Sequence, residues 1–249
     1  MSGNGSRVLV LGGSGEADEL ARALAQRGQD VTVSLLGTAR TSGTPPYRRR
    51  VGPFGGVTGL VGELERGRYR LLVDATHPFA AQMPMVAARA ASLARVPRVR
   101  IVRPPWTPGP DDAWQEVDDL AGAARRLGEL GRRRVFLSIG VAHLDPFAGL
   151  DVQPVVRSIE PPTTLPLRGA TVVVGRAPFS LDAELALLSE HRIEVLVARN
   201  SGGHATAAKL EAARRLGLAV VMVRRPPLPP GDLVETVGEA LVWVQSRLG

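Results

Sequence analysis

The 249-residue sequence predicts an α/β protein made of two domains, each built on a parallel sheet. Apolar strand-like runs alternate with helical patterns along the chain, which is typical of strands joined by crossover helices. Residues 104–110, PPWTPGP, can continue neither a strand nor a helix and form the best linker candidate. We therefore expect domains at residues 1–105 and 106–249, with a cleft between them that strand ends of both domains line.

Each strand is expected where a short apolar run ends in polar or turn residues, and each helix where apolar residues recur at helical spacing. The expected strands are residues 7–11, 31–35, 71–73, 98–102, 135–138, 152–157, 171–174, 194–198 and 219–223. The expected helices are residues 16–26, 57–66, 80–94, 120–130, 181–190, 205–216 and 233–247.

The two halves also resemble each other in sequence. Residues 69–77, YRLLVDATH, align with residues 193–201, IEVLVARNS, and an Ala-rich helical pattern follows each. Residues 99–105, VRIVRPP, then align with residues 221–227, VMVRRPP. The near-constant offset of about 122 to 124 residues favours a duplicated architecture over chance similarity.

Composition excludes several kinds of site and location. Cysteine is absent, which excludes disulfides, thiolate catalysis and Cys-ligated metals. The four histidines lack metal-ligand spacing, and no Walker or G-x-S-x-G pattern occurs, so we expect no metal site. No apolar run approaches the roughly 18 residues that a membrane span needs. No signal-peptide pattern precedes the first strand, and we expect a cytoplasmic protein with no membrane partner.

The charge of the chain favours small anionic ligands. The formal net charge is +7, and Lys209 is the only lysine beside many arginines. Arginine forms bidentate pairs with carboxylates and phosphates. Aromatic residues make up only 4% of the chain, whereas nucleic-acid modules usually add stacking aromatics, so we expect no nucleic-acid partner. The arginine runs at 48–50 and 132–134 are interpreted as solvated surface.

A glycine-rich loop follows the first expected strand. Glycines let a backbone approach a pyrophosphate, and the next helix offers free N–H groups to it. Position 18 is Asp18, so a G-x-G-x-x-G pattern lacks its third glycine, and a plain tight turn is the alternative. We interpret the N-terminal domain as Rossmann-like and nucleotide-binding. The candidate cofactor-binding residues here are Gly12, Gly13, Ser14, Gly15 and Glu16.

The end of the second expected strand carries hydroxyls and an arginine in place of an acid. NAD-selective folds place Asp or Glu there for the ribose hydroxyls, whereas an arginine accommodates the 2′-phosphate of NADP. The sequence therefore favours NADPH, with a solvated loop arginine as the alternative. The candidate residues are Ser34, Gly37, Thr38 and Arg40.

The segment DATHPFAA, residues 74–81, follows the strand-like run 71–73 and opens a helical pattern. In open α/β sheets, ligands bind beyond the carboxyl ends of strands. Thr76 and His77 are therefore candidate catalytic residues, and Thr76 is also a candidate cofactor contact. The alternative is that Asp74 and Thr76 only cap the helix and that His77 is a surface histidine.

Polar residues also follow the strands of the second half. The loop 199–206, RNSGGHAT, repeats the pattern of a glycine-containing loop before a helix, and a turn that merely needs glycine is the alternative. A lysine retained among arginines suggests a geometry that arginine does not reproduce. The candidate anion-binding residues in this half are Arg157, Arg176, Asn200, Ser201, Gly202 and Lys209.

Together these motifs resemble the precorrin-6A reductase family of cobalamin biosynthesis over nearly the whole chain. DATHPFA is the most specific of them. The others are GGSGEA at 12–17, SLLG at 34–37, GPFGG at 52–56, RSIEPP at 157–162, GRAPF at 175–179 and NSGG at 200–203 with Lys209.

The resemblance implies two α/β domains and an NADPH-dependent reduction of one double bond of precorrin-6A to give precorrin-6B. It implies a polycarboxylate tetrapyrrole as the substrate, bound by His77 and the anion-binding residues of the second half, with His77 or a water as proton donor. The family often has Gly-Arg at the second strand's end, whereas here Thr38 follows Gly37. The alternatives are a cobalt-precorrin-6A reductase that uses NADH, and a non-catalytic nucleotide- or nucleic-acid-binding protein.

Overall fold

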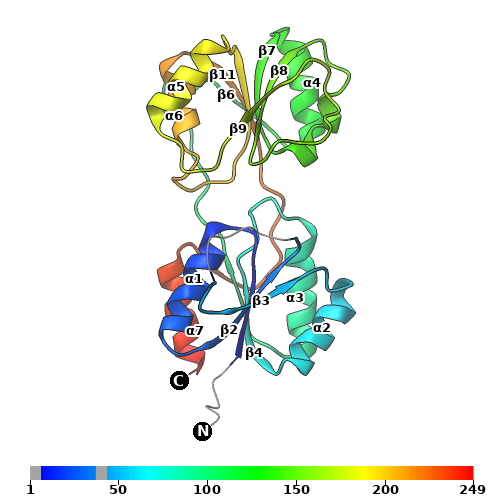
Figure 1. The fold of residues 1–249 in the computed structure, drawn as a ribbon, viewed down its shortest axis with the longest axis vertical. Coiled ribbons are helices and arrows are strands. Elements are labelled where there is room, and N and C mark those ends of the chain that lie inside the picture. Colours follow the sequence, from blue (N-terminus) through cyan, green and yellow to red (C-terminus); the bar gives the residue numbers. More distant parts are fainter. Residues whose placement is uncertain (1–6, 38–43, 249) are drawn as a thin grey trace. The chain divides into compact units, whose positions relative to one another are not determined.

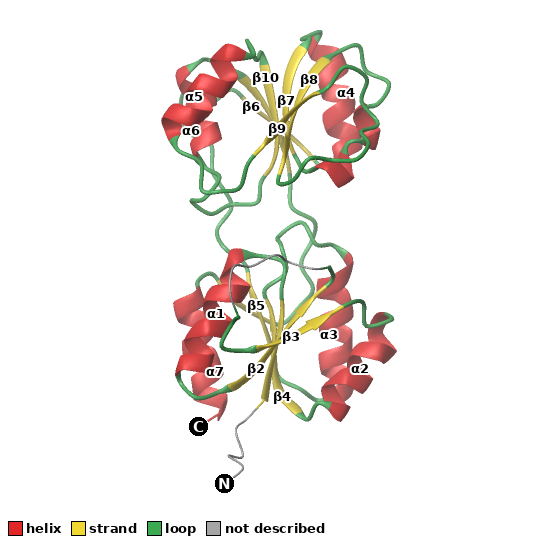
Figure 2. Cartoon of the chain, viewed as in Figure 1, coloured by secondary structure: helices red, strands yellow, loops and turns green. Residues whose placement is uncertain are grey.

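The computed structural model describes residues 7–37 and 44–248. These residues form two compact units, of which unit 1 is Met1–Arg103 with Pro226–Gly249 and unit 2 is Pro104–Arg225. Each unit contains a six-stranded parallel sheet with helices on both of its faces (Figures 1 and 2). The expected fold class of two parallel-sheet α/β domains is thus confirmed.

Unit 1 has the strand order β12-β5-β4-β1-β2-β3, which reverses direction along the chain between β1 and β4. Its strands are β1 (Arg7–Leu11), β2 (Asp30–Leu35), β3 (Arg48–Val51), β4 (Tyr69–Asp74), β5 (Arg98–Ile101) and β12 (Asp232–Val234). Its helices are α1 (Gly15–Gln26), α2 (Gly56–Arg66), α3 (Gln82–Ala94) and α7 (Val237–Leu248).

Unit 2 has the corresponding order β6-β11-β10-β7-β8-β9, with the reversal between β7 and β10. Its strands are β6 (Trp114–Val117), β7 (Arg134–Ser138), β8 (Gln153–Ser158), β9 (Thr171–Val174), β10 (Val195–Arg199) and β11 (Ala219–Val223). Its helices are α4 (Leu120–Leu130), α5 (Leu181–Glu190) and α6 (Ala208–Arg215), with the 3-10 turns η1 (Val141–His143) and η2 (Asp145–Phe147).

The C-terminal boundary differs from the expected second domain at 106–249. Strand β12 pairs with β5, with Asp232 opposite Val99, and therefore extends the sheet of unit 1. Helix α7 buries Val237, Ala240 and Val244 in the core that also contains residues of β1 and α1. Unit 1 is thus a circular permutation of unit 2, because its first strand and helix come from the end of the chain.

The strands form where both faces of an apolar run are covered. In β1, Val8 and Val10 face the cluster beneath α1 and α7, whereas Leu9 and Leu11 face the cluster beneath α2 and α3. Burial of each such side chain contributes roughly 1.5–3 kcal/mol. Continuous apolar runs of this kind are typical of parallel strands buried on both faces. The sheets therefore hold the loops at their carboxyl ends on well-packed frames.

Three strands were not expected from the sequence. Strand β3 consists of RRRV and lies beside β2 at the edge of the sheet that the described residues form, and this position requires no apolar run. Strands β6 and β12 are also edge strands, with the sequences WQEV and DLV. The last expected helix, 233–247, included residues 233 and 234 of β12, whereas α7 begins at Val237.

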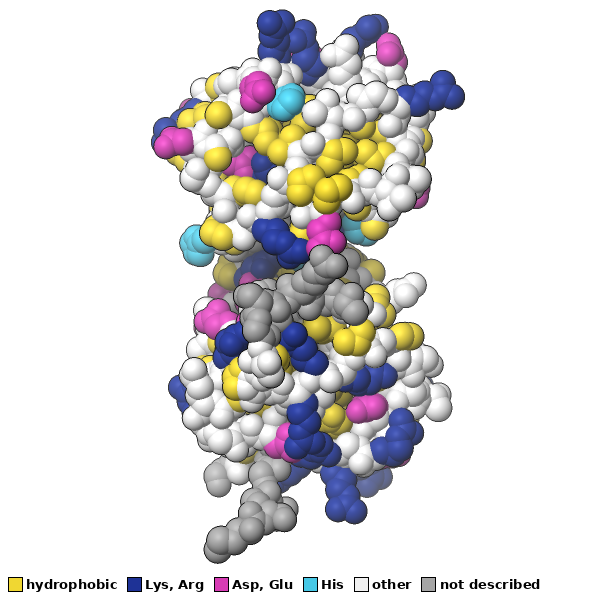
Figure 3. Space-filling view, in the orientation of Figure 1, with side chains coloured by type: hydrophobic (Ala, Val, Ile, Leu, Met, Phe, Trp, Pro, Cys, Tyr) yellow, Lys and Arg dark blue, Asp and Glu magenta, His cyan; other side chains and the backbone are white. Residues whose placement is uncertain are grey.

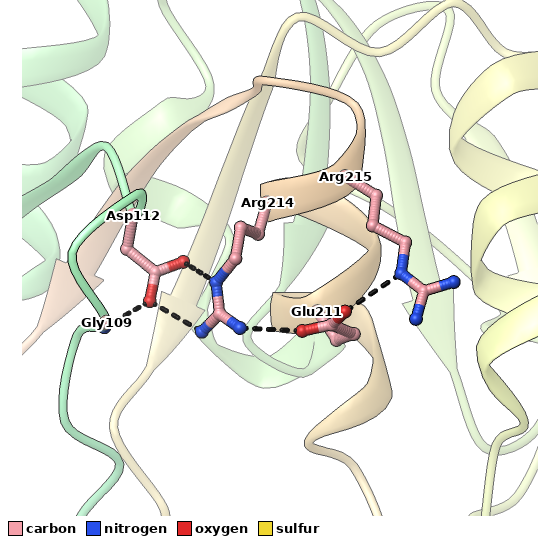
Figure 4. A network of polar contacts seen from close by, with 5 residues as sticks. All are labelled: Gly109, Asp112, Glu211, Arg214 and Arg215. Atoms are coloured by element: carbon pink, nitrogen blue, oxygen red, sulfur yellow. Dashed lines mark hydrogen bonds and ion pairs between the residues drawn. The ribbon is translucent and has the colours of Figure 1, made fainter.

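The chain passes between the units twice, once at Arg103–Pro104 and once at Arg225–Pro226. Both passages fall within the repeated Arg-Pro-Pro segments, whereas the sequence predicted only the first as a linker. Within unit 2, the segment after the first passage is held to α6 (Figure 4): Asp112 accepts hydrogen bonds from Gly109 N at 2.6 Å and from Arg214 Nε at 3.0 Å. Glu211 in turn accepts from Arg214 and Arg215.

Among the described residues, no helix has the length and apolar character to cross a membrane.

Candidate functional site

The loops that follow β1 and β4 lie together at the point where the strand order of unit 1 reverses. A Cβ placed on Gly13 would lie 3.6 Å from His77 N and 3.8 Å from Thr76 Cα. Ser14 Oγ donates a hydrogen bond to Ala75 O at 2.8 Å. Open sheets with this strand order bind dinucleotides in the crevice at the reversal. The fold therefore brings the glycine-rich loop and the DATHPFA segment to one candidate site.

The beginning of α1 has the features of an anion-binding site. Ser14 is the N-cap residue of α1, but its hydroxyl bonds to Ala75, and no side-chain hydrogen bond from Ser14 caps the helix. A Cβ on Gly15, the first residue of α1, would meet no heavy atom within 4 Å among the described residues. A helix N-terminus with space in front of it accepts a phosphate through its backbone N–H groups.

Gly12 has a different role from Gly15. Its N–H donates to Ser34 O at 2.8 Å, and a Cβ there would lie 2.6 Å from Leu35 Cδ2. Gly12 therefore lets the loop pack against β2. Gly13 has a φ of 133°, a backbone conformation that glycine adopts without strain. Gly12 thus allows close packing, Gly13 allows the backbone to turn, and Gly15 leaves open space at the start of α1.

Glu16 and Arg103 form an ion pair beside this loop. Arg103 Nη1 donates to Glu16 Oε1 at 2.6 Å. Burial raises the pKa of Glu16, but the hydrogen bond and charge of Arg103, the N–H of Glu16 and the Ser14 side chain outweigh it, and the pKa lies below its ordinary value. Glu16 Oε2 is buried and has no hydrogen-bond partner among the described residues. The pocket here is lined by Ser14, Glu16, Thr76, Pro78, Ile101 and Arg103.

A buried network holds Thr76 in place. Asp74 Oδ1 accepts hydrogen bonds from Thr76 N at 3.1 Å and from Thr76 Oγ1 at 2.7 Å. Asp74 Oδ2 accepts from Arg100 Nη1 at 3.2 Å, and Arg100 is only 1% exposed. Burial lowers the pKa of Arg100, and the charge of Asp74 opposes this shift. Because the Thr76 proton is directed at Asp74, the Thr76 hydroxyl can accept but not donate a hydrogen bond to a ligand.

His77 is half-buried directly beyond this network. Its Nδ1 accepts a hydrogen bond from Phe79 N at 3.2 Å. A ring nitrogen that accepts carries no proton, so the neutral imidazole has its proton on Nε2. The loop therefore fixes the tautomer of His77.

The expected contacts at the end of β2 are partly outside the described residues. Thr38 and Arg40 lie outside the described residues, whereas Gly37 follows β2 in a bend. Ser34 is buried and its Oγ accepts from Arg50 Nη1 at 3.3 Å. Arg50 lies on β3 within the run interpreted as solvated surface, yet its guanidinium also donates to Gly52 O at 2.6 Å. An arginine is therefore present at this strand end, supplied by β3.

Arg157 and Arg176 lie at the carboxyl ends of β8 and β9 in unit 2. Arg157 pairs with the buried Glu184 through its two Nη atoms, with Nη2 at 3.2 Å, and lies over the Phe179 ring at 4.0 Å. Arg176 is 57% exposed and pairs with Glu160 at 2.9 Å. The charge of Arg157 is thus balanced within unit 2, whereas Arg176 remains accessible.

The side chains of Asn200 and Lys209 contact Trp106, in the segment that enters unit 2. Asn200 accepts from Trp106 N at 2.8 Å and donates to Trp106 O at 2.9 Å. Trp106 Nε1 donates to Gly203 O at 2.9 Å. Lys209, 3% exposed, donates to Thr206 O at 2.6 Å and lies over the Trp106 ring at 4.6 Å. These contacts favour an anchoring role for the two side chains over direct contact with a ligand.

Ser201 and Gly202 continue this loop. Arg225 Nε donates to Asn200 O at 2.7 Å, and a Cβ on Gly202 would lie 2.1 Å from Pro104 O. Gly202 is therefore required by close packing against Pro104. Ser201 is half-buried at the same strand end.

Sequence reasoning missed three arginines near the candidate site, Arg50, Arg100 and Arg103. Arg100 was detectable as a charged residue inside an otherwise apolar strand, RVRI, because such a residue needs a buried partner. Arg103 belongs to the repeated Arg-Pro-Pro segment. No group of three or more His, Asp or Glu among the described residues has the arrangement of a metal site.

Comparisons with known proteins agree on one family. The chain matches the family model described as precorrin-6x reductase CbiJ/CobK over residues 7–245. The precorrin-6A reductase of Rhodococcus erythropolis is 46% identical over 242 residues, which cover 96% of this chain and 97% of the relative. The cobalt-precorrin-6A reductase of Synechocystis sp. is 25% identical, with 97% of each chain covered. A solved structure of CobK precorrin-6A reductase matches with a TM-score of 0.90 and 39% identity, covering 97% of both chains.

Proposed function

The chain belongs to the precorrin-6x reductase family CbiJ/CobK, and we propose that it reduces one double bond of precorrin-6A with NADPH to give precorrin-6B in cobalamin biosynthesis. The observation that carries this proposal is the crevice between β1 and β4, where a glycine loop precedes the open N-terminus of α1. That arrangement fits a dinucleotide pyrophosphate.

NADPH is proposed over NADH because of charge at the end of β2. The segment 34–40, SLLGTAR, contains no acid to bind ribose hydroxyls. Arg50 donates to the Ser34 hydroxyl at 3.3 Å and also pairs with Glu63 at 3.6 Å. An arginine at this strand end favours a phosphorylated ribose, since arginine–phosphate pairs are strong charge-assisted contacts. Arg40 remains a candidate for the same contact.

A metal-free macrocycle is proposed over its cobalt form because of relatedness. The precorrin-6A reductase relative is 46% identical, whereas the cobalt-precorrin-6A reductase relative is 25% identical. The substrate is a polycarboxylate, and the net charge of +7 favours its approach. On the face shown in Figure 3, Lys and Arg side chains lie in separate groups between acidic and uncharged ones. We place the reaction in the cytoplasm.

In unit 1, we assign some residues to holding the cofactor and others to delivering a proton to the reduced double bond. When bound, NADPH supplies a hydride, and reduction of the double bond also needs one proton. The α1 N-terminus and the loop Gly13–Glu16 would hold the pyrophosphate, and the Glu16 carboxylate would accept from a ribose hydroxyl or the carboxamide. Thr76 would support the ligand as an acceptor. His77, whose tautomer is fixed by the Phe79 N–H, is the proposed source of the proton, directly or through a water.

The test is anaerobic incubation of the purified protein with NADPH and precorrin-6A. We expect NADPH oxidation in step with a change in the absorbance of the macrocycle, and slower turnover with NADH. Cobalt-precorrin-6A in a parallel reaction tests the alternative substrate. Binding of NADPH without oxidation on either macrocycle would leave a non-catalytic nucleotide-binding protein and refute the proposal.

A further inference from the structure

The two units differ in the connection between one corresponding pair of strands. In unit 1, helix α1 joins β1 to β2 and packs against α7 on one face of the sheet (Figure 1). By strand order, β7 and β8 of unit 2 correspond to β1 and β2, and α4 follows β6 as α7 follows β12. Residues 139–152 join β7 to β8 and contain, in place of an α-helix, the turns η1 and η2 of three residues each. Turn η2 packs against α4, but it is much shorter than the twelve-residue α1.

Beside this connection, at the amino ends of β8 and β9, lies a cavity of about 510 Å³. Cavities that hold small molecules have volumes of about 300–1,000 Å³, so this one is large enough for a ligand. It lies at the opposite end of these strands from Arg157 and Arg176. Its apolar lining comes from the connections before β8 and before β9 and from β8 itself, and consists of Phe147, Leu150, Val152, Pro154 and Leu167.

The same end of the sheet in unit 1 is tied together by ion pairs. Asp30, the first residue of β2, accepts from Arg7 Nε at 3.0 Å and from Arg48 Nη2 at 2.8 Å, and these arginines begin β1 and β3. In the register of the sheets, Asp30 lies opposite Arg7 as Gln153 lies opposite Arg134. Gln153 carries no charge, so it cannot form the ion pairs that Asp30 forms. The cavity is therefore a feature of unit 2 and not of the repeated fold.

One guanidinium at the cavity carries a charge that no other side chain balances. Arg168 is exposed, lines the cavity and makes no hydrogen bond or ion pair with any residue that the structure describes. The other charged residue of the lining is Asp151, which pairs with Arg133 at 3.0 Å. The cavity therefore combines an apolar lining with one uncompensated positive charge.

A molecule with one carboxylate and an aliphatic chain satisfies both features. A guanidinium forms two parallel hydrogen bonds with a carboxylate. Each methylene that leaves water for an apolar wall strengthens binding by about fourfold. A polycarboxylate would leave most of its charges unpaired here, because Arg168 is the one cation of the lining.

We propose that this cavity is a second ligand site, which binds a medium-chain aliphatic monocarboxylate with its carboxylate on Arg168 and its chain against Phe147 and Leu167. The site goes beyond the proposed reaction, because it lies at the end of the unit 2 sheet opposite the strand ends that carry Arg157 and Arg176. It exists because two short turns replace the helix that covers this face in unit 1.

The first test varies the ligand. The probe is octanoate, titrated by calorimetry into the purified protein below the concentration at which octanoate forms micelles. We expect one site per chain, and hexanoate, which is two methylenes shorter, should bind about fifteenfold more weakly. 1-Octanol has the same chain without the charge and should bind about tenfold more weakly than octanoate. The absence of saturable octanoate binding, or equal affinities for octanoate and 1-octanol, would overturn the proposal.

The second test removes the charge. Arg168→Gln should raise Kd for octanoate by about tenfold and make octanoate and 1-octanol bind alike. The matched control is Arg125→Gln, which removes the same charge from an exposed position on α4 outside the lining and should leave Kd unchanged. Equal losses of affinity in the two variants would indicate general electrostatic attraction and contradict the contact with Arg168.

The third test fills the cavity. Gly149 lines it, its φ lies outside the left-handed region, and a Cβ there would meet no heavy atom within 4 Å. Gly149→Trp should therefore fold with the wild-type midpoint in urea and lose octanoate binding. Wild-type affinity for octanoate in the folded variant would place the ligand elsewhere and refute the site, and Arg168→Gln decides alone where Gly149→Trp does not fold. Kd for NADPH should stay unchanged in all three variants, so a failure of the proposed reductase function is measured separately from a failure of this site.

Discussion

Substitution of Gly15 separates cofactor binding from folding. A Cβ at Gly15 meets no heavy atom within 4 Å, and its φ lies outside the left-handed region, so alanine or valine fits the ligand-free protein. Gly12 is the matched contrast, because its Cβ would lie 2.6 Å from Leu35 Cδ2 and 3.1 Å from Val33 Cγ1. The two glycines are three residues apart in one loop, but only one of them is required by packing.

The expected magnitudes follow from these contacts. Gly12→Ala overpacks the β1–β2 contact and should lower the free energy of unfolding by about 1–3 kcal/mol. Gly15→Ala should change it by less than about 1 kcal/mol, because the side chain only restricts the unfolded chain. The same side chain blocks the approach of a pyrophosphate to the backbone. We expect Kd for NADPH to rise by about tenfold in Gly15→Ala and about a hundredfold in Gly15→Val, or about 1.4 and 2.7 kcal/mol.

The assay is a urea unfolding curve and an NADPH titration for each variant. Wild-type protein at an NADPH concentration of 100 times Kd should also gain about 2.7 kcal/mol of stability from the ligand, and Gly15→Val at the same concentration should gain far less. A folded Gly15→Val variant with wild-type affinity would refute the reasoning, because the loop would then be a turn that touches no phosphate.

Three further predictions follow from the described contacts. Arg100→Met leaves the charge of Asp74 buried without its ion-pair partner and should lower the free energy of unfolding in urea by about 3–5 kcal/mol. The double variant Arg100→Met with Asp74→Asn should recover most of this loss. Equal stabilities of wild type and Arg100→Met would contradict the network. His77→Asn keeps an acceptor for Phe79 N but removes Nε2–H, so kcat should fall about a hundredfold with NADPH affinity kept, and wild-type turnover would exclude the proton role. The hydrogen bond from Arg214 lowers the pKa of Asp112, so this contact stabilises unit 2 above the unfolded pKa of about 3.9 and is lost as pH falls through the lower folded value. The gap in thermal midpoint between wild type and Asp112→Asn should therefore narrow below pH 4, and a constant gap would contradict it.

Local sequence patterns predicted the strands that are buried on both faces and missed the edge strands. Leu71–Val73 is apolar because both faces of β4 are covered, whereas β3 carries three arginines because only β2 pairs with it. The position of β12 in the sheet of unit 1 could not be predicted for another reason. The pairing of Asp232 with Val99 joins segments more than a hundred residues apart, and no local pattern encodes such a contact.

The candidate site was predictable where polar residues end apolar runs. The glycine loop and Thr76–His77 were found in this way, and the structure brings them together. The functions of buried polar side chains were not predictable, because they depend on partners from distant segments. Asn200 lies at an expected strand end, but both the oxygen and the nitrogen of its side-chain amide are hydrogen-bonded to the backbone of Trp106, 94 residues away.

The duplication gives a physical reason why two similar strand ends can serve different ligands. A sheet fixes where the residues after its strands lie, and the residue types then decide which anion is bound. With Ala75 and a long helix, unit 1 offers backbone N–H groups, which suit phosphates that approach closely. At the equivalent strand end of unit 2, β7 is followed by the three-residue turn η1 in place of a long helix.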